Sequence, residues 1–498
     1  MSKPAKSPSA PPQGRRYVGT RETVAYIMFD MSASMNLNGL EDNFTQQILG
    51  LSNEVKSRLS WVIGAWDIVN DLLFASLVDA TRTRFGKFRP YLTFSLLVGM
   101  PITFFFYFMP FLFHTPDEIK WSYLFFKVLA DTSGTFNSIS RTGMIATITP
   151  DPYDRLRLIN IAEYLSSNLG EQLPIQLLTF LMQFVGHSGG ADGILARSKL
   201  FLGFGTATAV LSGVFALYFA LVSRERVPQS VEKPKILENF KALATNRPLL
   251  LLTLANMLSG INIDAGGEND YYMAVLNQPA LKLAIGIPGF FTGQLGVLSV
   301  RWARRTFSTR FLWIFTSHFL HATGILAYLI GRIPAGKGDR PDLLFNWKVM
   351  AAVLGIREAA FSPVLYVRQI VNADMQLECM DYGEWKNGFR SEGMTASVRE
   401  IFGKIVRLVF TPLSLKLKDV MGVGLKENYL RQSLRASRFI FGLFVLFPAV
   451  TSGLLGLIPK LFYNISAEDR ERMYQELAQR RQLAALSLTE TGADKDPA

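Results

Sequence analysis

Two aspartates lie four residues apart in an apolar stretch of this chain, and their spacing is its strongest chemical signal. The motif Trp-Asp-x-x-Asn-Asp begins at position 66, within residues 55–79, which are otherwise apolar enough to cross a bilayer. Residues at i and i+4 share one helix face, so Asp67 and Asp71 point the same way, with Asn70 beside them. Close carboxylates repel each other, and uncompensated charge in a membrane is costly. The pair predicts a site for Na⁺ or a proton; the alternative is a salt bridge to a basic residue such as Arg141 or Lys404.

A dense run of cations follows this stretch. It combines an aspartate, a glycine and several basic residues, namely Asp79, Arg82, Arg84, Gly86, Lys87 and Arg89. One interpretation of such a run is that it only sets the topology of the chain in the membrane. Its glycine and the following Pro90 indicate a tight turn, whose charges we expect to contact the ends of neighbouring helices. We therefore assign these residues a gating or structural role.

The composition is typical of a helical protein that spans the membrane several times. Of 498 residues, 49% are hydrophobic and 18% are charged, and apolar runs of about 18 to 25 residues recur along the chain. The formal net charge is +12, and most cations fall in short segments between apolar runs. The positive-inside rule explains these cations better than nucleic-acid binding does. Cys379 is the single cysteine, which excludes an intramolecular disulfide and a thiol-rich metal site.

We predict an all-α polytopic membrane protein with twelve transmembrane helices in two six-helix halves. The expected spans lie near residues 24–44, 55–79, 91–113, 119–147, 158–186, 199–222, 248–275, 280–301, 308–331, 346–370, 393–418 and 436–462. The predicted domains are a disordered cytoplasmic tail (1–20), an N-terminal bundle (21–222), a cytoplasmic linker (223–247), a C-terminal bundle (248–463) and a cytoplasmic tail (464–498). Two such halves are the layout of major facilitator transporters, whose substrate site lies between the halves.

The loops also predict orientation and location. Basic residues gather in loops on one side of the predicted spans, together with the N-terminal basic residues. This asymmetry places both termini in the cytoplasm and the protein in an inner or plasma membrane.

Two motifs resemble those of one transporter family. The run Trp-Asp-x-x-Asn-Asp and then Asp-x-Thr-Arg-x-Arg-x-Gly-Lys-x-Arg-Pro-Tyr, within residues 66–91, is similar to a signature of the glycoside–pentoside–hexuronide:cation symporters, the melibiose-permease family within the major facilitator fold. Residues 381–393 are similar to that family's segment between helices X and XI. The resemblance covers about Arg21 to Phe462 and implies gating or structural roles for Asp381, Glu384, Arg390 and Glu392.

The resemblance also implies a cation site. The family uses two helix II carboxylates, the asparagine between them and a helix IV threonine, which correspond to Asp67, Asn70, Asp71 and Thr135. All four residue types are kept. The implied coupling ion is Na⁺ or H⁺, with Li⁺ as a further candidate, and no other cofactor is expected.

The family's sugar-binding residues are matched only in part. Asp30 corresponds to a helix I aspartate that binds sugar hydroxyls, and Lys404 to a helix XI lysine that lines the same cavity. A second aspartate, an aromatic ring and an arginine are replaced by Ser138, Thr142 and Glu163.

Other charged residues are expected at or near membrane depth, namely Arg141, Glu163, Arg399, Glu400 and Arg407. A cavity with charges of both signs would suit a charged or zwitterionic solute. Alternatively, Arg141, Glu163 and Glu400 pair with one another and only stiffen the bundle. We count Glu400 among the candidate substrate-binding residues.

These observations predict a secondary symporter that moves a sugar, a glycoside or a related small polar solute with a cation by alternating access. The alternatives are a major facilitator carrier of a charged or lipid-like solute and a non-transporting membrane sensor. The sequence contains no Walker-type loop and no nucleophile elbow, which argues against ATP-driven transport and against an enzyme. The expected partners are a small solute, a monovalent cation and the lipid bilayer, with no nucleic acid, and we expect a monomer.

Overall fold

The computed structural model describes residues 17–80, 83, 86–149, 157–159, 161–162, 165–185, 191–226, 246–259, 267–336, 338, 340–387, 392–450, 453, 457, 468–477 and 479. Within these residues the regular structure is helical, apart from two isolated β-bridges. The chain divides into two compact units. The first comprises residues 1–232, 272–283 and 415–433, and the second comprises residues 233–271, 284–414 and 434–498.

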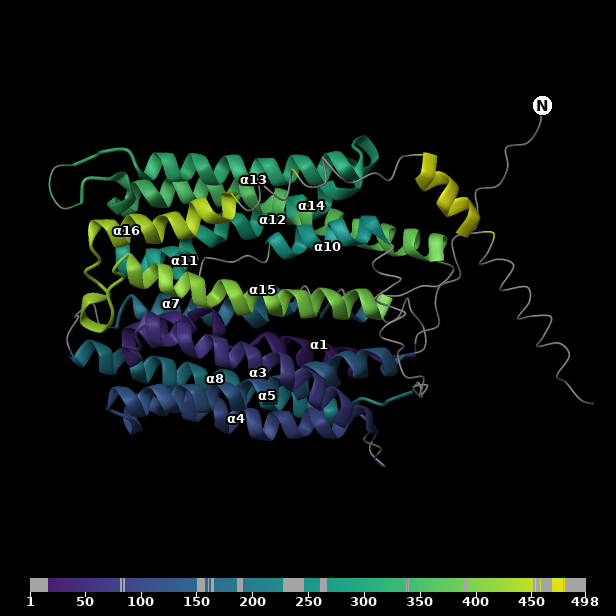
Figure 1. The fold of residues 1–498 in the computed structure, drawn as a ribbon, viewed down its shortest axis with the longest axis horizontal. Coiled ribbons are helices and arrows are strands. Elements are labelled where there is room, and N and C mark those ends of the chain that lie inside the picture. Colours follow the sequence, from purple (N-terminus) through teal and green to yellow (C-terminus); the bar gives the residue numbers. More distant parts are fainter. Residues whose placement is uncertain are drawn as a thin grey trace, which may run out of the picture. The chain divides into compact units, whose positions relative to one another are not determined.

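The first unit contains long helices, several of which lie side by side (Figure 1). Its α-helices are α1 (Thr20–Ser34), α2 (Glu41–Phe44), α3 (Asn53–Ala80), α4 (Arg89–Leu112), α5 (Pro116–Ile148), α7 (Leu173–Met182) and α8 (Ala191–Val222). Its short 3₁₀ and π segments are η1 (Asn38–Leu40), η2 (Thr45–Leu49), η3 (Ser166–Gln172) and η6 (Lys426–Asn428). Helix α4 packs on α5 and α8, α1 packs on α8 and η3, and α3 packs on α5.

The second unit holds most of the remaining helices. These are α10 (Arg247–Ser259), α11 (Gly267–Asp270), α12 (Leu281–Thr306), α13 (Thr309–Gly331), α14 (Trp347–Asn387), α15 (Glu392–Val420) and α16 (Leu434–Phe441), with η4 (Tyr271–Val275), η5 (Leu343–Phe345) and η7 (Gly442–Leu446). Helix α12 begins and α15 ends in residues that belong to the first unit, as does most of η4. In the second unit, α13 and α10 both pack on α14.

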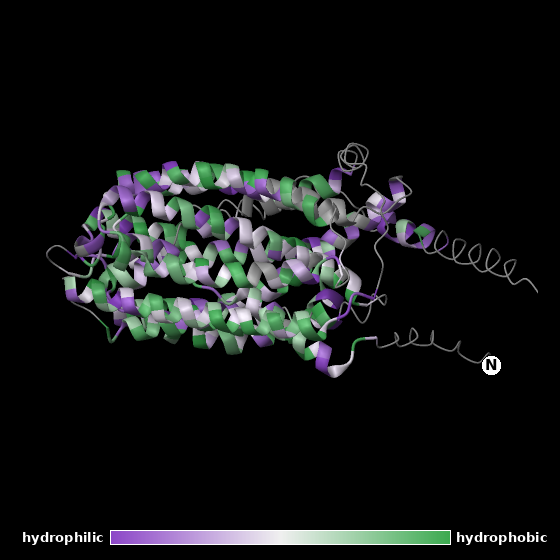
Figure 2. Ribbon diagram, turned by 90° about the horizontal axis from the view of Figure 1, so that it is seen from below, coloured by the Kyte–Doolittle hydropathy of each residue, from purple (hydrophilic) through white to green (hydrophobic). Residues whose placement is uncertain are grey.

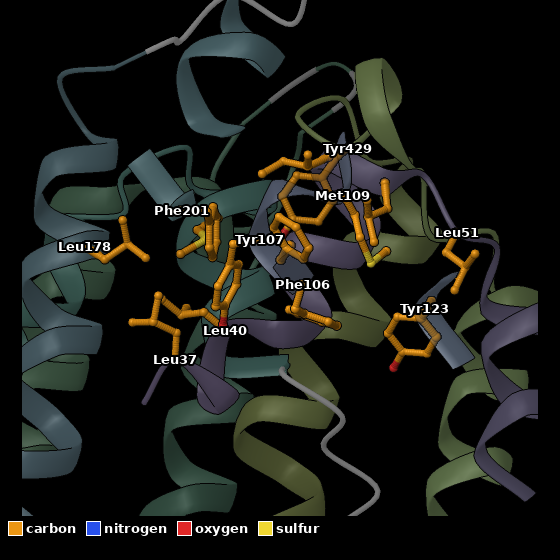
Figure 3. Close-up of a cluster of buried hydrophobic side chains, with 14 of the residues drawn as sticks. Leu37, Leu40, Leu51, Phe106, Tyr107, Met109, Tyr123, Leu178, Phe201 and Tyr429 are labelled. Carbon is orange, nitrogen blue, oxygen red and sulfur yellow. The ribbon is translucent and has the colours of Figure 1, made fainter. Parts of the chain in front are cut away.

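The first unit contains a buried core rich in aromatic rings (Figure 3). The ring centroid of Phe44 lies 5.1 Å from that of Tyr107 and 5.2 Å from that of Phe201. Tilted and edge-to-face pairs of this kind add to the free energy gained by apolar burial. Leu40 and Tyr429 are also fully buried in this cluster. The core therefore fixes α2, α4 and α8 to one another, and α1 leads directly into it.

The first predicted span, residues 24–44, is not one helix. Helix α1 ends at Ser34, and the chain continues through η1 and α2. Asn36 explains the interruption, because its side-chain oxygen accepts the backbone N–H of Asn38 at 2.9 Å and its amide donates to the carbonyl of Ser34 at 3.1 Å. Such local bonds compete with the helical backbone pattern.

We expected a loop after the tenth predicted span, residues 346–370, but the structure has a helix there. Helix α14 continues without interruption to Asn387. Residues 468–477 form a helix that contacts it, through an ion pair between Arg470 and Glu378 and a 2.7 Å hydrogen bond from Trp385 Nε1 to Glu476. These contacts support the extended end of α14.

Five of the described helices are long and apolar enough to cross a membrane, namely α4, α8, α12, α13 and residues Trp347–Lys386 of α14. Hydrophobic residues run along the long helices, and hydrophilic ones are more frequent near the helix ends (Figure 2). Large apolar side chains are exposed on these helices, including Leu221 (71%), Leu298 (76%) and Ile356 (72%). Exposure on this scale suits contact with lipid rather than water. The number of spans, twelve by our expectation, stays a prediction.

Candidate functional site

Helices α3 and α5 bring the predicted cation-binding residues together. The two helices pack along their length within the first unit (Figure 1). Helix α5 starts at a capping box, in which the hydroxyl of Thr115 accepts the backbone N–H of Glu118 and the Glu118 carboxylate accepts the N–H of Thr115. This cap fixes the first turn of α5 and hence the positions along the helix that face α3.

Three of the four predicted residues form a chain of hydrogen bonds. Asn70 donates from Nδ2 to Thr135 Oγ1 at 2.9 Å, and Thr135 donates from Oγ1 to Asp71 Oδ1 at 3.1 Å. Asn70 is completely buried and Thr135 is 6% exposed. The fourth residue, Asp67, is half-buried one helical turn before Asp71 on α3.

The carbonyl oxygen of Asn70 is a candidate ligand for a cation. Asn70 Oδ1 is buried and has no hydrogen-bond partner among the described residues. Buried amide oxygens are normally paired, so one without a partner indicates a site for a bound ion or water. No three His, Cys, Asp or Glu side chains in the described part of the chain are close enough to hold a metal ion. A cation here would therefore meet a mixed set of carboxylate, amide and hydroxyl oxygens, which are the hard donors that alkali-metal ions prefer.

The sequence analysis missed Asp131. Asn70 Nδ2 also donates to Asp131 Oδ2, at 3.0 Å. Asp131 lies four residues before Thr135 on α5, so the two side chains share the helix face that meets α3. That i, i+4 spacing was the signal in the sequence that could have identified it.

A cavity of about 390 Å³ lies between α5 and α1, next to the face of α5 that meets α3. Its volume is in the range of small-molecule pockets. The residues that line it include Tyr26, Asp30, Gly134, Asn137, Ser138 and Arg141. The predicted substrate-binding residues Asp30 and Ser138 therefore share one pocket.

Asp30 and Arg141 form an ion pair in this cavity. Asp30 is only 2% exposed, whereas the Arg141 side chain is 29% exposed and reaches the cavity. We had considered Arg141 as a partner for Asp67 and Asp71, and the structure instead pairs it with Asp30. A buried charge needs such a partner, because an uncompensated one is strongly destabilising.

The backbone near Asp30 is fixed by serines. Ser166 donates from Oγ to the carbonyl of Asp30 at 2.8 Å, and its hydroxyl lies 2.8 Å from that of Ser34. These bonds tie α1 to η3. Within the cavity wall, Asp30 Oδ2 and Asn137 Oδ1 are buried without a partner among the described residues. They are acceptors that the hydroxyls of a solute or waters would satisfy.

The remaining substrate-binding predictions are only partly located. Thr142 lies on α5 and Glu400 on α15, and their side chains are not among those described. Glu163 lies outside the described residues. Lys404 is a described residue of α15, in the second unit.

The turn between α3 and α4 is held by Glu225. Its carboxylate accepts the backbone N–H groups of Lys87, Phe88 and Arg89 at 2.9, 3.0 and 3.3 Å, at the start of α4. A carboxylate at a helix N-terminus is favourable. Gly86 has a φ of +107°, and a Cβ there would collide with the Glu225 side chain. This position therefore requires glycine.

The other predicted gating residues are distributed as follows. Asp79 lies in the last turn of α3 and Glu392 begins α15, while Asp381 and Glu384 lie on the extended end of α14 rather than in a loop. The guanidinium of Arg89 donates to the carbonyl of Ala220. Arg82, Arg84 and Arg390 lie outside the described residues.

Comparison with known proteins gives a consistent result. Residues 22–467 match the family model described as MFS/sugar transport protein. An isoprimeverose transporter of Lactiplantibacillus pentosus is 23% identical over 456 residues, covering 89% of this chain and 88% of that protein. A putative glycoside/cation symporter of Escherichia coli (strain K12), YagG, is 24% identical over 365 residues, covering 71% of this chain and 72% of that protein.

The fold is shared with a solved transporter structure. A crystal structure of a D-xylose-proton symporter has a TM-score of 0.55 at 12% identity, covering 89% of this chain and 96% of that one. The predicted major facilitator fold and the predicted family resemblance are confirmed by these findings.

Proposed function

Because the chain belongs to the MFS/sugar transport protein family, we propose that it couples the entry of a cation to the transport of a sugar-like solute through the sites on α3 and α5. The protein is a multi-pass membrane transporter and not an enzyme. The observation that carries the proposal is the chain of hydrogen bonds from Asn70 through Thr135 to Asp71, beside the carbonyl oxygen of Asn70, which is buried and has no partner among the described residues.

The proposed cation site consists of Asp67, Asn70, Asp71 and Thr135. Two carboxylates one turn apart repel each other, and a cation between them removes that repulsion. In a membrane, this neutralisation lowers the cost of moving α3 against its surroundings. Cation binding would therefore favour the rocking of the two halves by which such carriers alternate their access.

The proposed solute is a polyhydroxylated, sugar-like molecule. The cavity offers a carboxylate, a guanidinium, an amide and a hydroxyl within about 390 Å³. Two of its buried acceptor oxygens have no partner in the described part of the chain. Such a set matches a solute with several hydroxyl groups. The names of the isoprimeverose transporter and the glycoside/cation symporter support the same class.

One observation favours a second candidate, a solute that carries charge. The Arg141 guanidinium reaches the cavity and has donors beyond the one that pairs with Asp30. An anionic group on the solute would accept hydrogen bonds from them. Competition of a neutral sugar and its uronic acid for uptake separates the two candidates.

Uptake driven by an imposed gradient tests the coupling. In proteoliposomes, Asp67→Cys and Asp71→Cys should abolish solute accumulation driven by Na⁺, Li⁺ or H⁺ gradients while leaving protein insertion normal. Asp117→Asn is a matched control, because that side chain is 89% exposed at the start of α5. Wild-type accumulation in either cysteine variant would contradict the proposed cation site. The gradient that drives uptake in the unmodified protein identifies the ion.

Orientation and assembly complete the proposal. We place both termini in the cytoplasm and the protein in an inner or plasma membrane, as a monomer. Labelling of single cysteines introduced at Gly338 and at Ser433, in a Cys379→Ala background and in intact cells, checks the topology.

A further inference from the structure

Asp131 lies beside the proposed cation site and is not part of the sequence motifs described above. The Asn70 amide group has two N–H bonds, and both are used, one to Thr135 Oγ1 at 2.9 Å and one to Asp131 Oδ2 at 3.0 Å. An ionised carboxylate only accepts hydrogen bonds. Asp131 can therefore face the NH₂ end of the amide and not its oxygen.

This contact determines which end of the amide is available to a cation. With the NH₂ group held by Asp131, the carbonyl oxygen of Asn70 occupies the opposite corner of the amide. There it is fully buried and has no hydrogen-bond partner among the described residues. An amide that turned by 180° would bring its oxygen against the Asp131 carboxylate and its N–H groups to the ligand position, which would repel a cation.

The charges around Asp131 show why a third carboxylate is tolerated here. Lys127 lies one turn earlier on the same face of α5, where it and Asp131 attract each other electrostatically. The Lys127 ammonium also bonds Glu41 Oε2 at 2.8 Å, and the hydroxyl of Tyr123 donates to Glu41 Oε1 at 2.7 Å. Asp131 thus lies between a compensated charge cluster and the proposed cation site.

We infer that Asp131 is a positioning residue of the cation site, which holds the Asn70 amide with its carbonyl oxygen available to the ion and thereby sets the affinity for that ion. The inference rests on the proposed function of Asp67 and Asp71. Asp131 acts through Asn70, not by direct contact with the cation, since no three acidic side chains converge in the described residues.

Two substitutions at Asp131 separate positioning from packing. Asp131→Leu keeps the number and branching of the side-chain heavy atoms and removes the acceptor, so the Asn70 amide loses its fixed orientation. The concentration of Na⁺ that gives half-maximal uptake should rise about tenfold. If Na⁺ does not drive uptake in the wild type, the same titration is made with Li⁺ or with external pH. The KM for solute at saturating cation should stay within about twofold. Asp131→Asn keeps an acceptor oxygen, so its effect should be clearly smaller.

Lys127→Met is the matched control, because it removes the other charge on this face of α5 and leaves the Asn70 contacts intact. If Asp131 only served to pair with Lys127, then Lys127→Met and Asp131→Leu would change the cation dependence equally, and that result would overturn the inference. An unchanged cation dependence in Asp131→Leu would overturn it as well.

The swapped double variant Asn70→Asp/Asp131→Asn keeps the test decisive if Asp131→Leu fails to fold. The single change Asn70→Asp places two carboxylates together, whereas the swap restores an amide–carboxylate hydrogen bond. Recovery of cation-dependent thermal stabilisation by the swap, relative to Asn70→Asp, supports the inference, and no recovery contradicts it. A failure of the proposed function gives a different result from a failure of this inference. The proposed function fails if Asp71→Cys keeps gradient-driven uptake, whereas the inference is tested by the variants at Asp131 and Asn70.

Discussion

The two faces of α5 differ in how they resemble the family. The face toward α3 carries Thr135, which keeps the family's residue type and joins Asn70 to Asp71. The face toward α1 carries Ser138 and Arg141, where the family's aspartate is absent and an arginine pairs with Asp30 instead. One helix thus contributes both to the proposed cation site, whose residue types are kept, and to the candidate solute cavity, whose residue types are altered.

In the proposed function, the driving ion and the solute contact different residues of one helix. The hydrogen bonds that join Asn70, Thr135 and Asp71 do not involve Ser138 or Arg141. We therefore expect that substrate preference can diverge without loss of the proposed coupling site. Substitutions on each face test how complete this separation is.

The largest effect is expected at the cavity face from Arg141→Met. The change leaves the Asp30 carboxylate buried without its counter-charge and should lower the free energy of unfolding by about 3 kcal/mol. It should also abolish solute uptake. Thermal unfolding in detergent and uptake assays measure the two effects, and the double variant Asp30→Asn/Arg141→Met should recover stability but not transport. A single variant as stable as the wild type would contradict the structural role of the pair.

On the α3 face, Thr135→Val should weaken cation binding with little change in solute recognition. Valine keeps the shape and removes the hydroxyl between Asn70 and Asp71, a loss of about 1.4 kcal/mol, or a tenfold increase in the half-maximal cation concentration. Thr132→Val is the control on the same helix, since that hydroxyl accepts from Trp66 Nε1 at 3.0 Å. Equal effects of the two substitutions would show that helix packing, not the ion site, had been measured.

Ser138→Ala should have a smaller effect, confined to the solute. It removes one polar group from the cavity wall and should raise the KM for solute by roughly threefold. The cation dependence measured at saturating solute should be unchanged. If the cation dependence shifts as much as the KM, the two faces of α5 do not act separately.

The smallest effect is expected from acid, outside both faces. The bidentate hydrogen bonds from Arg438 to Asp342 and the charge of nearby Arg332 hold the pKa of the Asp342 carboxyl below its usual range. The resulting stability is present at neutral pH and is lost as the pH falls below about 4 and through the lowered pKa. Asp342→Asn should lower Tm at pH 7 by on the order of 2 °C and flatten the acid side of the Tm profile. If the dependence of Tm on pH in Asp342→Asn is identical to that of the wild type, the ion pairs of Asp342 do not contribute to stability against acid.

Much of the fold could be predicted from the sequence, because the length of an apolar run and the charge of a loop are local properties. The apolar runs predicted α4, α8 and α13 near their observed positions. The interruption after Ser34 was not predicted, since it depends on hydrogen bonds made by the Asn36 side chain. The continuation of α14 to Asn387 was missed for a similar reason, because contacts with residues 468–477 support it.

The candidate site shows the same limit. The i, i+4 spacing predicted roles for Asp67 and Asp71, the motif added Asn70, and the family resemblance added Thr135. The contact of Asn70 with Asp131 joins residues 61 positions apart, and that of Arg141 with Asp30 joins residues 111 positions apart. Such pairings depend on which helices are neighbours and on how each is rotated, and a single sequence contains neither.

The length of α14 has a mechanical consequence. Its 41 residues rise over about 60 Å, whereas the hydrocarbon layer is about 30 Å thick. Roughly half of this helix therefore projects beyond the apolar layer. A small tilt of the part within the membrane produces a larger displacement at the far end of the helix, near Asp381 and Trp385. A spin label or fluorophore attached there would register movements of the carrier that are too small to follow inside the bilayer.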